Sequence, residues 1–117
     1  MLHAYREQCA FCRFKHLEIL DAAHIIQDGE PDGDPVVSNG VALCKLHHAA
    51  FDRFMIGIRP DDVIEVRDDI LKEKDGPMLL HGLQGMHLKK IMLPRQPHAW
   101  PDTDLLKRRY EKFRVAV

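Results

Sequence analysis

The segment LCKLHHAAFD concentrates side chains that can bind metals or move protons. It contains Cys44, two adjacent histidines (His47 and His48) and Asp52, four residues after the second histidine. Its alanines, leucine and phenylalanine recur at helical spacing, so we expect a helix over residues 45–54. Neighbouring residues on a helix point about 100° apart, whereas residues four apart share a face. The two histidines are therefore expected to serve different sites, with Asp52 on the side of His48.

One of these sites involves a pair of cysteines near the N-terminus. Cys9 and Cys12 are spaced C-x2-C, and Cys44 and His47 are spaced C-x2-H. Three thiolates and one imidazole form a closed tetrahedral site of the kind that holds structural zinc. Such a site would contribute directly to folding, which a small core needs. Metal-free buried cysteines and a redox C-x2-C pair are the alternatives, although no thioredoxin-like βαβ pattern surrounds the motif.

A second set of polar side chains lies on two expected strands and on the same helix. It consists of Asp21, His24, Asn39, His48 and Asp52. Apolar runs predict a strand over residues 17–25 and a second strand or extended segment over residues 38–44. The intervening QDGEPDGDP is made of turn residues, which predicts an exposed loop. The strands and the helix would therefore have to bring this second set together.

The order of these motifs resembles the HNH endonuclease family, which has the ββα-metal nuclease fold. That family shows a histidine at the end of a strand, an asparagine after a loop and a metal-binding histidine at the start of a helix. Zinc-stapled members add cysteine pairs before and around these motifs. This chain reads C-x2-C, DAAHI, SNG and LC-x2-HH-x3-D in that order, over about residues 9–52. The resemblance implies an α+β fold, with a ββα-metal core, a structural Cys3His zinc site, extra short strands and a C-terminal helix.

The resemblance also implies a role for each residue of the second set. His24 matches the general base that takes a proton from the attacking water, and histidine is suited to this near neutral pH. Asn39 matches the asparagine that holds the strand–loop geometry and orients the base. His48 and Asp52 match ligands of a catalytic divalent cation such as Mg²⁺, Mn²⁺ or Ni²⁺, which would stabilise charge on the scissile phosphate. The expected products carry a 5′ phosphate and a 3′ hydroxyl.

One position departs from the family pattern. Many members carry Asp or His directly before the first catalytic histidine, whereas this chain has Ala23. Asp21 points to the same strand face one pleat earlier, so Asp21 or a water molecule would fill the missing ligand position. Three of these residues also have an interpretation without a catalytic role. Asp52 would be an exposed residue of the helix, Asn39 would only form a turn, and His24 would be an ordinary strand histidine.

The C-terminal part is expected to contribute a helix and a basic surface. DTDLLKRRYEKF can be capped by Asp102 or Thr103, and an apolar stripe runs from Leu106 to Phe113. Residues 76–117 carry eight Lys/Arg against three Asp/Glu, a net +5, although the whole chain is −1. A solvated helix face is one interpretation, and a phosphate-binding surface is the other. The residues expected to contact nucleic acid are Lys107, Arg108, Arg109 and Lys112.

A chain of 117 residues is long enough for one domain. We expect a single HNH nuclease domain over 1–117, with the zinc-stapled core at about 9–54 and a C-terminal extension at about 55–117. In the extension, MIGIRP and DVIEVRD predict two short strands and DILKEK predicts a short helix. Two glycines leave MLLHGLQGMHLKKIMLP ambiguous. No apolar run reaches the length of a membrane span and no signal-peptide core occurs, so we expect a cytoplasmic protein without membrane contact.

The resemblance implies an endonuclease whose partner is DNA and whose reaction is phosphodiester hydrolysis. The C-terminal part is similar, more weakly, to HNH domains at the end of bacterial restriction enzymes that act on modified DNA. We therefore expect the nuclease part of a restriction system. The alternatives are a zinc-stapled nucleic-acid-binding or interaction module without catalysis, which Ala23 favours, and an RNA-cleaving toxin on the same fold. The sequence leaves the oligomeric state open, a homodimer included.

Overall fold

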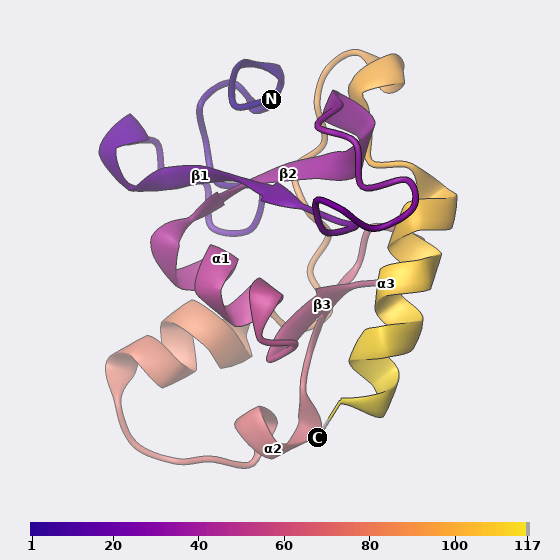
Figure 1. Cartoon of the computed structure of the whole chain (residues 1–117). Helices are drawn as coiled ribbons and strands as arrows, with labels where there is room; N and C mark the ends of the chain where they lie inside the picture. The colour runs from indigo at the N-terminus through magenta and orange to yellow at the C-terminus, as the bar shows by residue number, and fades with distance from the viewer. Residues whose placement is uncertain (117) are drawn as a thin grey trace.

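The computed structural model describes residues 1–116 as an α+β fold built around two β-hairpins (Figure 1). The strands are β1 (Leu20–His24), β2 (Gly40–Cys44), β3 (Ile56–Ile58) and β4 (Ile64–Val66). The helices are α1 (Lys45–Asp52), α2 (Asp68–Leu71) and α3 (Thr103–Val115). Short 3-10 turns form at η1 (His3–Tyr5), η2 (Leu17–Ile19), η3 (Val37–Asn39), η5 (Gln84–Met86) and η6 (Pro97–Ala99). A π-helical segment forms at η4 (Met78–Leu83). The expected α+β class, with extra short strands and a C-terminal helix, is confirmed.

The first hairpin and α1 form a ββα unit. β1 and β2 are antiparallel, with Leu20 opposite Cys44 and His24 opposite Gly40. Every residue of β2 is buried, so this strand is enclosed on both faces. α1 begins directly after Cys44 and packs against both strands. The absence of a connecting loop fixes the start of α1 to the end of β2, and with it the histidines of the helix.

The first hairpin and α1 are shorter than the sequence predicts. A strand over residues 17–25 was expected, but pairing stops at Leu20 because its partner Cys44 is the last residue of β2. The preceding η2 turn leaves Leu17 and Ile19 half-exposed. The helix expected over residues 45–54 ends at Asp52, since Phe54 has a φ of +57° that cannot continue a right-handed helix.

The second hairpin packs against the C-terminal helix. β3 and β4 are antiparallel, with Ile56 opposite Val66. α3 crosses β3 so closely that a Cβ at Gly57 would lie 2.8 Å from Cγ of Phe113. A glycine is therefore required where the helix meets the strand. Figure 1 shows α3 running beside both the second hairpin and the loop between β1 and β2.

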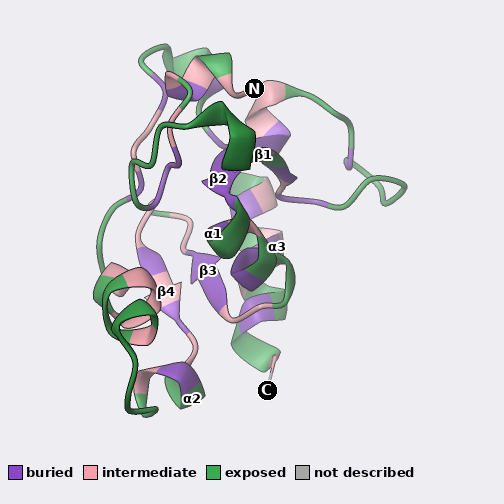
Figure 2. Ribbon diagram, turned by 90° about the vertical axis from the view of Figure 1, so that its left-hand side faces the viewer, coloured by how far each residue is buried: buried purple, intermediate pink, exposed green. Residues whose placement is uncertain are grey.

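The core lies between the two hairpins and the inner faces of α1 and α3, whereas the β1–β2 loop is exposed (Figure 2). Its largest fully buried side chains are Tyr5, Ile25, Leu43, Phe51, Ile56, Ile64 and Leu106. Within residues 1–116, no helix is both long and apolar enough to cross a bilayer.

The N-terminus of α3 is capped by Asp102, as its sequence predicts. The Oδ1 atom of Asp102 accepts hydrogen bonds from the backbone N–H groups of Asp104 and Leu105, at 2.9 and 3.2 Å. These bonds satisfy two of the amide groups that a helix leaves without partners in its first turn. The cap therefore fixes where α3 begins.

We predict that Asp102→Ala destabilises the protein by about 1 kcal/mol, because two N-terminal amide groups lose their acceptor. In thermal unfolding followed by circular dichroism, the melting temperature should fall by roughly 4 °C. Asp102→Asn is the matched control, since it keeps a side-chain oxygen in the same place. Equal destabilisation by both variants would contradict a capping role.

Candidate functional site

Four metal-binding side chains converge where the N-terminal turn meets the start of α1. Cys9 and Cys12 follow η1, Cys44 ends β2, and His47 lies in the first turn of α1. Their ligand atoms all lie within 4.8 Å of one another. All three cysteines are free thiols. The fold thus brings together the two pairs that were identified by spacing.

The distances within this Cys3His cluster match a tetrahedral zinc site. Zinc–sulfur bonds of about 2.3 Å and zinc–nitrogen bonds of about 2.0 Å place two sulfurs about 3.8 Å apart, and a sulfur and a nitrogen about 3.5 Å apart. The Sγ atoms of Cys12 and Cys44 are 3.9 Å apart. Nδ1 of His47 lies 3.6 Å from Sγ of Cys9 and 3.3 Å from Sγ of Cys44. The residues present therefore fit a structural zinc ion.

The ring of His47 is held in the orientation that a ligand needs. Its Nε2 lies 2.6 Å from the carbonyl oxygen of Gly82 in η4. A carbonyl can only accept, so Nε2 carries a proton and Nδ1 is the ring nitrogen that faces the cysteines, as a metal ligand must. The ring is buried and packs against Phe11, with 5.3 Å between ring centroids. The sequence alone does not point to Gly82, because a backbone carbonyl leaves no mark in the residue type.

The protonation of the Cys3His cluster is coupled to the binding of a cation. Hydrogen bonds from Cys12 and Cys44 lower the pKa of Cys9, whereas those to Cys44 and Cys9 raise the pKa of Cys12. The cluster therefore favours deprotonation of one thiol and opposes deprotonation of a second. Burial lowers the pKa of His47, but hydrogen bonds to Cys44 and Cys9 outweigh it and raise the pKa to about 10. A bound metal must displace these protons, so affinity is expected to weaken as the pH falls.

A second group, Asp21, His48 and Asp52, lies on the other side of α1. Nδ1 of His48 is 2.8 Å from Oδ2 of Asp21, and its Nε2 is 3.1 Å from Oδ2 of Asp52. Hydrogen bonds from His48 and then from Lys45 lower the pKa of Asp21. The side chains of Asp21 and His48 are 26% exposed and that of Asp52 is 42% exposed, so solvent reaches all three. The adjacent histidines therefore point to different sites.

The donor types of this second group suit a divalent cation. Two carboxylates and one imidazole can hold Mg²⁺, Mn²⁺ or a similar ion. Each carboxylate approaches a different nitrogen of His48, so the ring lies between them. Within residues 1–116, the Cys3His cluster alone holds three or more such ligand atoms within 4.8 Å. One cation bound by all three of Asp21, His48 and Asp52 would require these side chains to rotate, and their role as ligands stays a prediction.

Asn39 fixes the chain directly after β1. Its side chain is fully buried, and its Oδ1 accepts from the backbone N–H of Ile26 at 2.8 Å. Its Nδ2 donates to the carbonyls of Ile26 and Asp34, each at 3.0 Å. The carbonyl of Asn39 accepts from the N–H of Ile25 at 3.0 Å. Asn39 therefore ties the residues that follow His24 to the start of β2, which a simple turn former would not do.

His24 is the last residue of β1 and is half-buried. It pairs with Gly40, where the side chain of Met1 occupies the space that a Cβ would need. No hydrogen bond or ion pair between described residues joins His24 to the group of Asp21, His48 and Asp52. Its role as a base stays a prediction that rests on its position in the motif.

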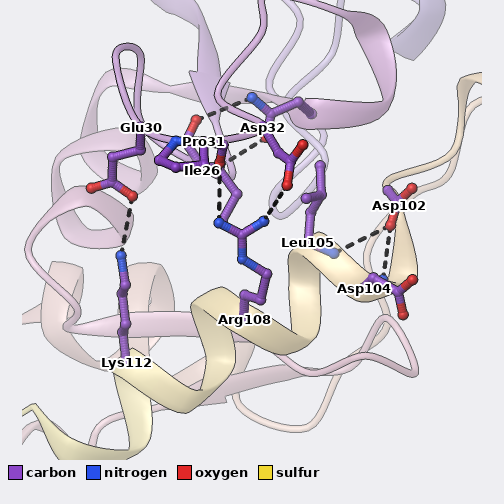
Figure 3. Close-up of polar contacts among 10 residues, drawn as sticks. Ile26, Glu30, Pro31, Asp32, Asp102, Asp104, Leu105, Arg108 and Lys112 are labelled. Atoms are coloured by element: carbon purple, nitrogen blue, oxygen red, sulfur yellow. Dashed lines mark hydrogen bonds and ion pairs between the residues drawn. The ribbon is translucent and has the colours of Figure 1, made fainter.

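Two of the basic residues on α3 contact the acidic β1–β2 loop (Figure 3). Nη1 of Arg108 is 2.9 Å from Oδ2 of Asp32, and its Nη2 donates to the carbonyl of Pro31 at 3.1 Å. Nζ of Lys112 is 3.3 Å from Oε2 of Glu30. Lys107 is exposed. The loop therefore occupies part of the surface that was expected to contact phosphate.

Arg109 departs from the sequence expectation, because it is only 6% exposed. Its Nη1 donates to the carbonyl of Ile25 at 3.1 Å and its Nη2 to the carbonyl of Phe51 at 2.6 Å. Burial lowers its pKa to about 10, opposed in part by the charges of Asp52 and Glu30. Both terminal nitrogens already donate to backbone carbonyls, so Arg109 is less suited to a phosphate contact than its exposed neighbours, although it borders a pocket beside Lys112.

Comparison with known proteins finds a family match that includes the ββα unit. Residues 9–59 match the model of the HNH endonuclease family. Over this segment the chain is similar to the HNH endonuclease family, as the order of its motifs predicted. No curated protein matches the chain.

A solved structure extends the likeness beyond that segment. It is described as a modification-dependent TagI restriction endonuclease, and it aligns with a TM-score of 0.59 at 20% sequence identity. The alignment covers 95% of this chain and 35% of that one, so the chain spans about a third of that protein's length. At this identity the likeness shows the fold, and it includes most of the part that follows the ββα unit.

We predict that purified protein holds about one zinc ion per chain, and that His47→Ala loses it, because a tetrahedral site needs four ligands. The melting temperature should fall by at least about 10 °C, since binding of structural zinc contributes directly to folding. Elemental analysis and thermal unfolding measure both effects. Folded parent protein without zinc would refute the assignment.

We predict the opposite outcome for His48→Ala. Its zinc content should equal the parent's and its stability should stay within about 0.5 kcal/mol, as expected for a partly exposed residue. Binding of Mn²⁺ at a second site should weaken, because the imidazole donor is gone. Asp52→Ala should behave in the same way but more mildly, since water can replace a carboxylate ligand. Calorimetry of Mn²⁺ binding to zinc-loaded protein measures this, and unfolding of His48→Ala with a stable His47→Ala would show that the roles are reversed.

Proposed function

We propose that this chain is a metal-dependent endonuclease that hydrolyses phosphodiester bonds in DNA. The match to the HNH endonuclease family supports a nuclease, because the matched segment contains the full order of motifs from Cys9 to Asp52. The observation that carries the proposal is that the two adjacent histidines of α1 face different groups of side chains. His47 faces the cysteines, whereas His48 faces Asp21 and Asp52. A protein that needed only the structural zinc site would not require Asp21, His48 and Asp52 to lie together beside it.

In the proposed reaction, the residues of the chain bind, orient and accept a proton. Asp21, His48 and Asp52 would hold a divalent cation once the side chain of His48 no longer bridges the two carboxylates. When bound, such a cation supplies Lewis-acid stabilisation of the charge that develops on the phosphate. Nε2 or Nδ1 of His24 takes the proton from the attacking water. Asn39 keeps the chain after His24 in place, so the imidazole stays at the end of β1.

The proposed setting is a restriction system. The relative described as a modification-dependent restriction endonuclease supports this, since its fold covers 95% of this chain. We propose that residues 1–117 act as one nuclease domain, with a core at about 9–54 and an extension at about 55–117. Lys107, Arg108 and Lys112 are the proposed DNA contacts on α3. For Arg108 and Lys112, phosphates would take the place of the loop carboxylates that they now face.

We predict that His24→Ala lowers the rate of plasmid cleavage by about 100-fold or more, because general-base catalysis typically contributes that much. The assay compares Mg²⁺, Mn²⁺, Ni²⁺ and EDTA, and EDTA added to zinc-loaded protein should abolish cleavage. Products of the parent should be ligatable without treatment, as expected for a 5′ phosphate and a 3′ hydroxyl.

His16→Ala is the matched control, since His16 is an exposed histidine outside the proposed site. It should cleave at the parent's rate. Cleavage by His24→Ala at that rate would exclude His24 as the base. A parent chain that binds DNA but does not cleave it with any of these cations would favour the non-catalytic binding module instead.

A further inference from the structure

Arg109 is a buried charged residue that no part of the proposed reaction uses. It lies at the middle of α3 and reaches across the core with both of its terminal nitrogens. Nη1 donates to the carbonyl of Ile25 at 3.1 Å, and Nη2 donates to the carbonyl of Phe51 at 2.6 Å. One planar side chain therefore bonds two segments that are separated by 26 positions in the sequence (25 to 51).

The two carbonyls stand next to the two halves of the proposed site. Ile25 directly follows His24, the proposed base, and Phe51 directly precedes Asp52, a proposed metal ligand. Arg109 thus connects the end of β1 to the end of α1 at the residues adjoining these two side chains. The match to the HNH family ends at residue 59, so this connection comes from outside the matched segment.

The guanidinium has little freedom to move. Its central carbon lies 3.9 Å from the ring centroid of Phe51 and 4.7 Å from that of Phe54. Stacking on aromatic rings and a fixed fork of donors both restrict an arginine side chain. Arg109 also lines, together with Ile25, Phe54 and Asp52, a pocket of about 400 Å³ on the side of Lys112. The Asp52 carboxylate therefore lies beside a positive charge whose position is set by the core.

Packing alone does not account for this choice of residue. Burying a charge without a hydrogen-bonded carboxylate carries a desolvation penalty, and an apolar side chain of similar volume would often be as stable or more so. No apolar side chain can donate to two carbonyls at once. What distinguishes arginine here is that it sets the spacing between the two segments.

We propose that Arg109 is a positioning residue, which holds His24 and Asp52 at the separation that the reaction needs. This inference rests on the proposed nuclease function. A displacement of about 1 Å in such a site can lower a rate about 100-fold. Arg109→Met should therefore lower kcat by about that factor while KM for plasmid DNA stays within about twofold.

The test compares Arg109→Met with Arg114→Met, which removes an exposed arginine from the last turn of the same helix. Rates are measured well below the melting temperature and divided by the concentration of zinc-loaded, folded protein. Arg114→Met should retain the parent's kcat. A purely structural role for Arg109 would reduce the folded fraction but not the rate per folded molecule, and a DNA-binding role would raise KM and reduce its dependence on salt.

If Arg109→Met does not fold, Arg109→Lys provides the second test, because lysine keeps the charge and can reach one carbonyl but not both. Its kcat should lie between the parent's and one-hundredth of it, again with KM unchanged. Millimolar guanidinium should partly restore cleavage by Arg109→Ala, whereas the same concentration of sodium chloride should not.

The possible results distinguish failure of the proposed nuclease function from failure of the positioning role alone. A parent chain that does not cleave DNA overturns the proposed function, and this inference falls with it. A parent that cleaves, together with folded Arg109→Met or Arg109→Lys that cleaves equally fast, overturns the positioning role alone. A rise in KM without a change in kcat does the same, because it would make Arg109 part of DNA binding.

Discussion

The divergence of two adjacent helical side chains is the constraint on which the site depends. His47 and His48 leave α1 about 100° apart, so one helix start can serve two clusters at once. His47 is buried among the cysteines, and His48 faces two carboxylates near solvent. This division works only if the helix begins at a fixed residue. The direct junction of Cys44 with α1 provides that, because Cys44 is both the last residue of β2 and a member of the Cys3His cluster.

The Cys3His cluster stabilises more than the N-terminus. Cys9 and Cys12 bring the first turn to α1, while the carbonyl of Gly82 brings η4 to the same histidine. Segments from the start, middle and later part of the chain therefore meet at one imidazole. In a domain of this size, where a core alone gives limited stability, such a crossing point is expected to determine whether the fold forms. The exposed side of α1 can then carry chemistry, because its stability does not rest on the residues that face solvent.

Local patterns predicted much of this arrangement. The ligand spacing identified the Cys3His cluster, and the cap and apolar stripe identified α3 to within two residues. The burial of Arg109 was also signalled, since Arg109 lies three residues after Leu106 and four before Phe113, on the same helix face. The charge of Arg109 suggested exposure to solvent, but its tertiary contacts hold the side chain in the core. The pairing of Arg108 with Asp32 was not predictable in this way, because the two residues are 76 positions apart and both charges are equally consistent with free, solvated side chains.

The contacts between α3 and the β1–β2 loop differ in how easily they can be exchanged. The pairs made by Arg108 and Lys112 are partly exposed, so solvent and salt weaken them and a phosphate can compete for either cation. Arg109 and Asn39 are buried, and breaking their hydrogen bonds would leave polar groups without partners. The acidic loop can therefore release the outer basic residues of α3 without loosening the inner contacts. In the proposed nuclease, α3 would keep the site in register through its buried arginine while its outer charges exchange loop carboxylates for phosphates.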